Sequence, residues 1–190
     1  MNCNPPSIST AGVAAGQVSY AVVEPRAFLK LSGVLRHPLS KRLNLAVGKL
    51  FAWPGVRSVV VDLQAAEFID STCLGLLARV ATTSQELGYE RPVLFSTHRE
   101  VNRLLRSMGF DRVFVLVENP EVPTAGWQSA EALAGLAKCP DPQLVLDAHR
   151  ALCEINAQNR HLFQSVIDQL ELEVGGDEAN GGSQQRRTLL

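Results

Sequence analysis

Three consecutive polar residues, Asp70, Ser71 and Thr72, interrupt an otherwise apolar stretch, EFIDSTCLGLLARV, at residues 67–80. An aspartate just before a helical pattern can accept hydrogen bonds from the free N–H groups of the first turn. Serine and threonine are common at helix starts for the same capping reason. A serine there can also carry a phosphoryl group, which adds about −1.5 to −2 charge units at neutral pH. Helix capping and a phosphorylation switch therefore both fit these residues.

Ser71 and Cys73 are also the residues that a covalent enzyme would use. Such a nucleophile needs a general base held nearby, and His98 is the only candidate that the expected layout brings close, with no partner of its own. The sequence has no GxxxxGK[ST] nucleotide loop and no GxSxG elbow around Ser71. We therefore expect no catalytic residues and no cofactor. A thiol near a helix N-terminus can have a lowered pKa, but the simpler interpretation of Cys73 is a small, half-buried apolar residue.

Metal binding is the other chemistry to consider. His149, Cys153 and His161 lie at steps of four and eight residues. Two ligands four apart can bind zinc, but a third at eight turns away around a helix, and no acid completes the set. We expect no metal site. The four cysteines of the chain lack the paired spacing of zinc sites, so we expect free thiols.

The elements that must position Ser71 alternate between strands and helices. The run Val59–Val61 is β-branched and typical of a strand buried on both faces. The first two predicted strands are joined by a short link and form a hairpin. The alternation predicts an α/β fold with parallel strand pairs. Strands are expected at 17–24, 26–33, 56–63, 91–96 and 111–118, and helices at 38–53, 71–88 and 99–109.

Loops that follow parallel strands gather at one edge of the sheet, so we expect a rim around Ser71. Residues 33–38 follow the second strand and residues 96–99 follow the fourth. His98 and Arg99 could contact a partner or an approaching phosphate. The simpler interpretation of this loop is a strand-to-helix turn in which Thr97 caps the next helix.

The chain divides into five segments by composition: a flexible leader at 1–16, a domain at 17–118, a linker at 119–127, a helical extension at 128–174 and a disordered tail at 175–190. Within the extension we expect a short helix at 127–139 and one long helix from Pro142 to about Glu173. The long helix has a single apolar seam with Asn159 inside it. That seam could fold back on the sheet, dimerise or bind a partner helix.

Composition narrows the function classes further. The chain has 190 residues and a net charge of −1, so no basic excess supports nucleic-acid binding. No apolar run approaches the length of a membrane span, and the N-terminus lacks the pattern of a secretory signal. We therefore expect a cytoplasmic protein that binds neither nucleic acid nor membrane. A hydrophobic content of 46% supports a packed core.

The order strand, strand, helix, strand, helix, strand, helix, strand resembles the STAS domain of bacterial anti-sigma factor antagonists. Residues 59–77, VVVDLQAAEFIDSTCLGLL, are similar to that family's signature, a strand ending in Asp-Leu followed by Asp-Ser-Ser/Thr-Gly-Leu-Gly. Residues 101–118 resemble its closing helix and strand. The resemblance covers residues 17–118 and implies a mixed sheet of about five strands with interspersed helices, followed here by a C-terminal helical extension.

In that family the serine after the aspartate is phosphorylated by a partner anti-sigma factor, an ATP-dependent serine kinase, and the phosphorylated antagonist lets go. A PP2C-type phosphatase restores the antagonist, which then captures the anti-sigma factor and frees the sigma factor for transcription. By position, the resemblance implies that Ser71 is the phospho-acceptor and Thr72 a secondary candidate. With the rim added, the expected partner-binding residues are Asp70, Ser71, Thr72, Cys73, Gly75, His98 and Arg99.

One departure from the family pattern concerns Cys73, which stands where the family usually has glycine. Glycine in the first turn lets a partner backbone approach closely, so we expect the Cys73 thiol to lie on the docking surface and to restrict partner choice. The alternative function is a STAS scaffold or adaptor in a signalling assembly. Ser71 would then stay unmodified, and the C-terminal helix could mediate contacts, including a homodimer.

Overall fold

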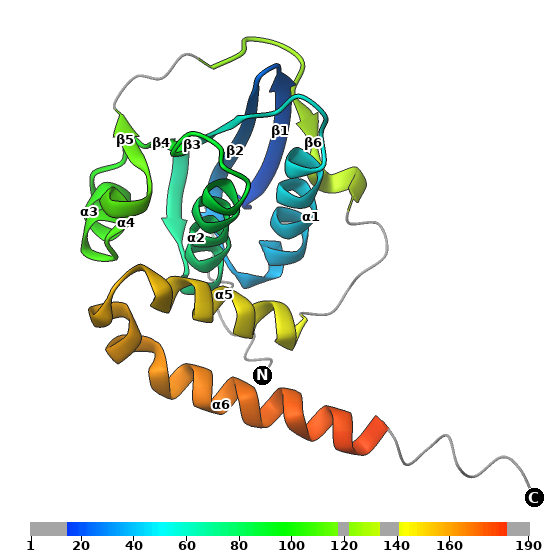
Figure 1. Cartoon of the computed structure of the whole chain (residues 1–190), viewed down its shortest axis with the longest axis vertical. Coiled ribbons are helices and arrows are strands. Elements are labelled where there is room, and N and C mark those ends of the chain that lie inside the picture. Colours follow the sequence, from blue (N-terminus) through cyan, green and yellow to red (C-terminus); the bar gives the residue numbers. More distant parts are fainter. Residues whose placement is uncertain (1–14, 118–121, 134–140, 182–190) are drawn as a thin grey trace, which may run out of the picture.

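A six-stranded mixed sheet forms the centre of the molecule, with strand order β5-β4-β3-β2-β1-β6 (Figure 1). The computed structural model describes residues 15–117, 122–133 and 141–181. Strands β2 to β5 run parallel, while β1 pairs antiparallel with both β2 and β6. The strands are β1 (Gln17–Val23), β2 (Arg26–Leu35), β3 (Ser58–Ile69), β4 (Val93–Phe95), β5 (Val115–Val117) and β6 (Gln128–Ser129).

The helices lie between the parallel strands and after the sheet. In chain order they are the 3-10 helix η1 (His37–Leu39), α1 (Ser40–Phe51), α2 (Ser71–Glu86), α3 (Arg99–Ser107), α4 (Phe110–Val113), the 3-10 helix η2 (Ala130–Leu133), α5 (Pro142–Ile155) and α6 (Ala157–Gly181). The expected α/β fold, the hairpin of β1 and β2 and the C-terminal helices are confirmed.

The two central strands are buried on both faces because their side chains alternate between two clusters. Leu29 and Val61 belong to the main core on the side of α1 and α2. Phe28 and Val60 point to the opposite face, where Trp127 packs against them. The prediction that the valine run of β3 is buried on both faces is therefore confirmed.

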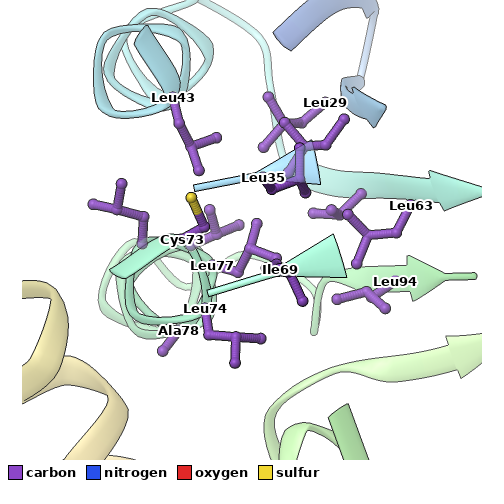
Figure 2. Close-up of a cluster of buried hydrophobic side chains, with 14 of the residues drawn as sticks. Leu29, Leu35, Leu43, Leu63, Ile69, Cys73, Leu74, Leu77, Ala78 and Leu94 are labelled. Atoms are coloured by element: carbon purple, nitrogen blue, oxygen red, sulfur yellow. The ribbon is translucent and has the colours of Figure 1, made fainter. Parts of the chain in front are cut away.

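Helix α2 is fixed against the sheet by close apolar packing. Figure 2 shows Leu74 and Leu77 of α2 directed towards Leu63 and Leu94 of the strands, and Leu43 of α1 closes the cluster beside them. Burying a leucine side chain contributes on the order of 2 kcal/mol, so this packing holds the start of α2 firmly at the end of β3.

The closing part of the sheet differs from the sequence prediction. Residues 110–113 form helix α4, and only Val115–Val117 pair as a strand, so the predicted strand at 111–118 is mostly wrong. Phe110 and Phe114 lie four residues apart, stack with ring centroids 5.6 Å apart and are both buried. A helical turn is the local structure that places residues four apart on one face, which is why the chain becomes extended only after Phe114.

The predicted single helix from Pro142 to about Glu173 is also wrong, because the chain breaks at Asn156. Asn156 has an extended backbone, with φ −163° and ψ 165°, and its Oδ1 accepts a hydrogen bond from the N–H of Asn159 at 2.8 Å. Asn156 thus ends α5 and caps α6. Figure 1 shows α6 turning back beside α5.

Two other helix boundaries in the C-terminal extension differ from those predicted from the sequence. Strand β6 and η2 replace the start of the short helix predicted at 127–139, and α6 continues to Gly181, beyond the expected end at residue 174. Residues 1–14 of the predicted leader, residue 118 of the predicted domain, residues 119–121 of the linker, residues 134–140 of the extension and residues 182–190 of the tail lie outside the described residues. Within the described part of the chain, no helix is long and apolar enough to cross a membrane.

The junction of α5 and α6 is tied to the domain by two asparagines. Asn159 is fully buried, and its Nδ2 donates to the carbonyl oxygens of Met108 and Leu152, both at 2.9 Å. Asn156 Nδ2 donates to the same Met108 oxygen at 3.0 Å. The seam therefore folds back on the domain, but α5 packs against α2 and not on the sheet, as the first interpretation of the seam had it.

Candidate functional site

Asp70 organises the start of α2, as the sequence predicts. Its backbone is extended, and its Oδ1 accepts a hydrogen bond from the N–H of Cys73 at 2.9 Å, which is the geometry of a helix N-cap. Its Oδ2 accepts a second hydrogen bond, from the N–H of His37 at 2.5 Å. This second bond brings the loop after β2 to the start of α2, as expected, although residues 33–35 of the predicted loop belong to β2 itself.

Ser71 makes its contact with the C-terminal extension. Its Oγ lies 3.0 Å from Nε2 of His149 in α5, while Nδ1 of His149 lies 2.8 Å from the carbonyl oxygen of Val145. Because a carbonyl oxygen only accepts, we assign the ring proton to Nδ1, and Nε2 then accepts the Ser71 O–H. The imidazole is only 4% exposed and packs edge-on against Phe163 of α6. The Ser71 side chain is part-exposed, yet its hydroxyl is hydrogen-bonded to His149 of α5.

Gly75 lets α5 approach α2 closely. A Cβ at this position would lie 2.0 Å from the carbonyl oxygen of Ala148 and 2.9 Å from its Cα. Both distances are far shorter than a van der Waals contact, so only glycine fits here. In Figure 1, α5 crosses the end of the sheet at which α2 begins. The close backbone approach that Gly75 allows is therefore made by α5 of the same chain.

Cys73 does not lie on the docking surface, and that prediction is wrong. Its side chain is fully buried, and Figure 2 shows the sulfur pointing from α2 towards Leu43 of α1. Burial, together with the nearby negative charge of Asp70, raises the pKa of the Cys73 thiol. The thiol is therefore a small core residue and not an activated nucleophile. The reason is helical geometry, since position 73 lies on the inward side of the first turn.

Thr72 and the loop at 96–99 also differ from the expected docking surface. Thr72 is 4% exposed, so its hydroxyl is far less accessible than that of Ser71. His98 and Arg99 are exposed, and His98 is the N-cap residue of α3. Thr97 does not cap that helix, because its Oγ1 donates to the carbonyl oxygen of Gln64 at 3.4 Å. This bond fastens the loop to β3.

Sequence reasoning missed three residues around Ser71. The sequence singles out His149 only as a possible metal ligand, and nothing local in the sequence links it to a serine 78 positions away. Phe68, two residues before Asp70, is 46% exposed, and the guanidinium of Arg36 lies 5.3 Å from the centre of its ring. An apolar residue alternating outward at the end of β3 was the available signal for Phe68. Within the described residues, no group of three potential metal ligands gathers.

The pair of Ser71 and His149 could in principle move a proton from the hydroxyl to the ring. A hydrolase would further need room for an acyl group in contact with Oγ. Here α5 itself lies against the hydroxyl, and the ring is buried between Val145 and Phe163. The arrangement holds the hydroxyl in place and does not present it to a substrate.

The fold and the site together define a mixed α/β domain in which the first turn of an aspartate-capped helix carries a serine at the carboxyl edge of parallel strands. The family model of the STAS domain matches residues 18–122, more than half of the chain. The chain therefore belongs to the STAS domain family. No curated protein matches it.

Several solved structures match part of the chain at low sequence identity. Phosphorylated SpoIIAA from Bacillus is 16% identical, with a TM-score of 0.46, and the match covers 56% of this chain and 93% of that chain. An anti-sigma factor antagonist from Mycobacterium paratuberculosis is 20% identical, with a TM-score of 0.47 and coverages of 55% and 87%. Unphosphorylated SpoIIAA is 15% identical, with a TM-score of 0.45 and coverages of 56% and 90%.

Proposed function

We propose that this protein is an anti-sigma factor antagonist in a phosphorylation-controlled partner-switching pathway of the bacterial cytoplasm. The unphosphorylated form binds an anti-sigma factor that is also a serine kinase, and a sigma factor is thereby released. Phosphorylation of Ser71 abolishes this binding. The observation that supports the proposal is that Ser71 lies in the first turn of an Asp70-capped helix, inside the region that the STAS family model matches.

The chemistry of the switch follows from that placement. The kinase transfers the γ-phosphoryl group of ATP to Ser71 Oγ, with loss of the hydroxyl proton and release of ADP. The new group adds about −1.5 to −2 charge units beside the Asp70 carboxylate, which already accepts two backbone N–H groups. A partner pressed against this helix start meets uncompensated negative charge and dissociates, while the fold stays intact. Hydrolysis by a PP2C-type phosphatase restores the hydroxyl.

We propose a binding role without catalysis. Cys73 is buried with a raised thiol pKa, and the Ser71 hydroxyl donates to His149 of α5, a buried ring that packs against Phe163 of α6. A fluorophosphonate probe that labels activated serines is expected to leave Ser71 unmodified. Selective labelling of Ser71 would contradict this part of the proposal.

The experiment that tests the function compares Ser71 variants in binding to each kinase-type anti-sigma factor of the source organism, with and without ATP. The wild-type chain should bind without ATP and dissociate when ATP is added. Ser71→Ala should remain bound in both conditions, and Ser71→Asp should bind weakly in both, because a carboxylate mimics part of the phosphate charge. Thr72→Val is the matched control, since it removes the neighbouring buried hydroxyl, and it should behave as wild type. Equal loss of binding in Ser71→Ala and Ser71→Asp would refute the proposal.

A scaffold or adaptor role is the second candidate, and one observation favours it. The Ser71 hydroxyl is engaged by His149, as it would be in a protein whose serine stays unmodified. In that case Ser71→Ala would leave the cellular output unchanged, and no phosphate would be found on the chain. The homodimer through the C-terminal helix remains a prediction; α6 exposes Leu162 and Leu172 on its surface.

A further inference from the structure

We propose that the C-terminal extension is an intramolecular competitor for the switch face. The switch face is the stripe of α2 formed by Ser71, Gly75 and Arg79, which recur every four residues. Helix α5 occupies this stripe. An anti-sigma factor can therefore bind the switch face, and its kinase domain can phosphorylate Ser71, only after α5 has moved away. The identity of the competing partner rests on the proposed function, whereas the covering contact itself can be tested without it.

The contacts of α5 run along the whole stripe. Ser71 hydrogen-bonds His149 at the first turn of α2, and Gly75 meets the backbone of Ala148 one turn later. Another turn on, Arg79 lines a groove whose opposite wall is formed by α5. The extension therefore follows the switch face and does not merely touch its edge.

The glycine in this stripe shows that the surface is shaped for close backbone contact. Glycine destabilises a helix interior relative to alanine, and Gly75 lies inside α2. Its compensating contact in this structure is the backbone of Ala148. The surface beside Gly75, which the proposed partner would contact, is already covered by the backbone of α5.

Phosphorylation and the docked position of α5 are mutually exclusive at Ser71. The Oγ–Nε2 distance of 3.0 Å leaves no room for a phosphoryl group between the two side chains. The Ser71 proton is directed at His149, whereas transfer from ATP needs Oγ aligned with the γ-phosphorus, with loss of that proton and release of ADP. His149 must therefore withdraw before the reaction, and it cannot return to the same position afterwards.

Helix α5 packs both on the domain and on α6. Leu146 and Cys153 of α5 form an apolar cluster with Ile167 of α6, whereas Leu144, Ala148 and Leu152 of α5 belong to the main core of the domain. Asn156 and Asn159 also bond the α5–α6 junction to Met108. Departure of α5 from the switch face therefore exposes part of the main core, and a competing partner must cover that surface in its place.

The covering contact can be tested by alkylation of a cysteine placed at position 71 in the full chain. We would measure the rate at which iodoacetamide modifies Ser71→Cys, by peptide mass spectrometry, alone and combined with Ala148→Glu or Ala157→Glu. Ala148 is buried against α2, whereas Ala157 is exposed at the start of α6, so the second variant is the matched control. We expect at least tenfold faster modification with Ala148→Glu and no change with Ala157→Glu. Equal rates in the three chains would overturn the proposal.

Cys73 reports within the same experiment whether the domain stays folded, because it is fully buried between α2 and α1. It should remain unmodified when position 71 becomes reactive. If Ala148→Glu also exposes Cys73, His149→Ala takes its place, since it removes only the side chain that contacts position 71. A rate increase with His149→Ala supports the proposal, and an unchanged rate opposes it.

The competition is tested with Ser71 intact and the kinase-type anti-sigma factor as probe. Ala148→Glu should raise kcat/KM for phosphorylation of Ser71 at least tenfold, and Ala157→Glu should leave it unchanged. Equal kcat/KM values would overturn the competitor role while leaving the proposed function in place. If no kinase modifies either chain although alkylation shows that α5 covers position 71, the proposed function fails and the covering contact stands.

Discussion

Replacing Gly75 by alanine should weaken the docking of α5 while leaving the domain folded. The added Cβ would lie 2.0 Å from the carbonyl oxygen of Ala148, and ordinary contact begins at 3.4 Å. Backbone atoms cannot rotate away as a side chain does, so the whole helix α5 must shift. The variant thus acts on one contact between two helices.

The magnitude follows from the two effects of the new methyl group. Overpacking in a well-packed contact costs about 1–3 kcal/mol. Alanine also favours the helix by about 1 kcal/mol relative to glycine, but it does so whether α5 is docked or not, so this gain cancels in the docking equilibrium. Docking of α5 should therefore weaken by about 1–3 kcal/mol, which is roughly 5- to 150-fold.

Amide hydrogen exchange measured by mass spectrometry is the suitable assay, because it reports local opening separately from global unfolding. Peptides from α5 (Pro142–Ile155) should exchange roughly 5- to 150-fold faster in Gly75→Ala, whereas peptides from β2 and β3 should not change. Gly48→Ala is the matched control: it lies in α1, its Cβ would meet nothing within 4 Å, and it should stabilise the domain by about 1 kcal/mol. Unchanged exchange of α5 in Gly75→Ala would refute the reasoning, as would an equal increase in the central strands.

Three further variants test other parts of the structure. Asp70→Ala removes the cap of α2 and the acceptor for the His37 N–H, so urea titration should show a free energy of unfolding lower by about 1–2 kcal/mol; an unchanged value would contradict the capping role. Burial raises the pKa of Asp62 above its ordinary 3.8, so its charged form destabilises the fold above the raised pKa, and this penalty vanishes as the pH falls towards the ordinary value. Asp62→Asn should therefore stabilise the fold at neutral pH but not at pH 3, and a loss of stability at neutral pH would show that the carboxylate is needed. Asn159→Ala removes donors to Met108 and Leu152 and should loosen the α5–α6 junction by about 1–3 kcal/mol, seen as faster exchange there than in β3.

The parts of the fold that could be predicted are those specified by local sequence. The continuous valine run of β3 and the three- and four-residue steps of apolar side chains in α2 can be read directly from neighbouring residues, and both elements are present in the structure. The role of Asp70 as a cap follows from its place directly before that helix. Each of these features depends on residues within a few positions of one another.

The parts that could not be predicted depend on tertiary contacts. The apolar seam of the extension continues past Asn156, yet the helix breaks there because two asparagines donate hydrogen bonds to Met108, the C-cap residue of α3. The inward direction of Cys73 depends on where α1 packs. The bond between Ser71 and His149 joins positions 78 residues apart, so no local pattern could reveal that the extension covers the site.

The most direct test of the central claim is the intact mass of the protein purified from its native cells, before and after phosphatase treatment, with any phosphate mapped by peptide sequencing. The proposed switch predicts one removable phosphate, located on Ser71 and absent from the buried Thr72. It also predicts that the phosphorylated fraction changes with growth or stress. A chain that carries no phosphate on Ser71 in any condition would contradict the claim, and the adaptor role of the extension would then be the better explanation.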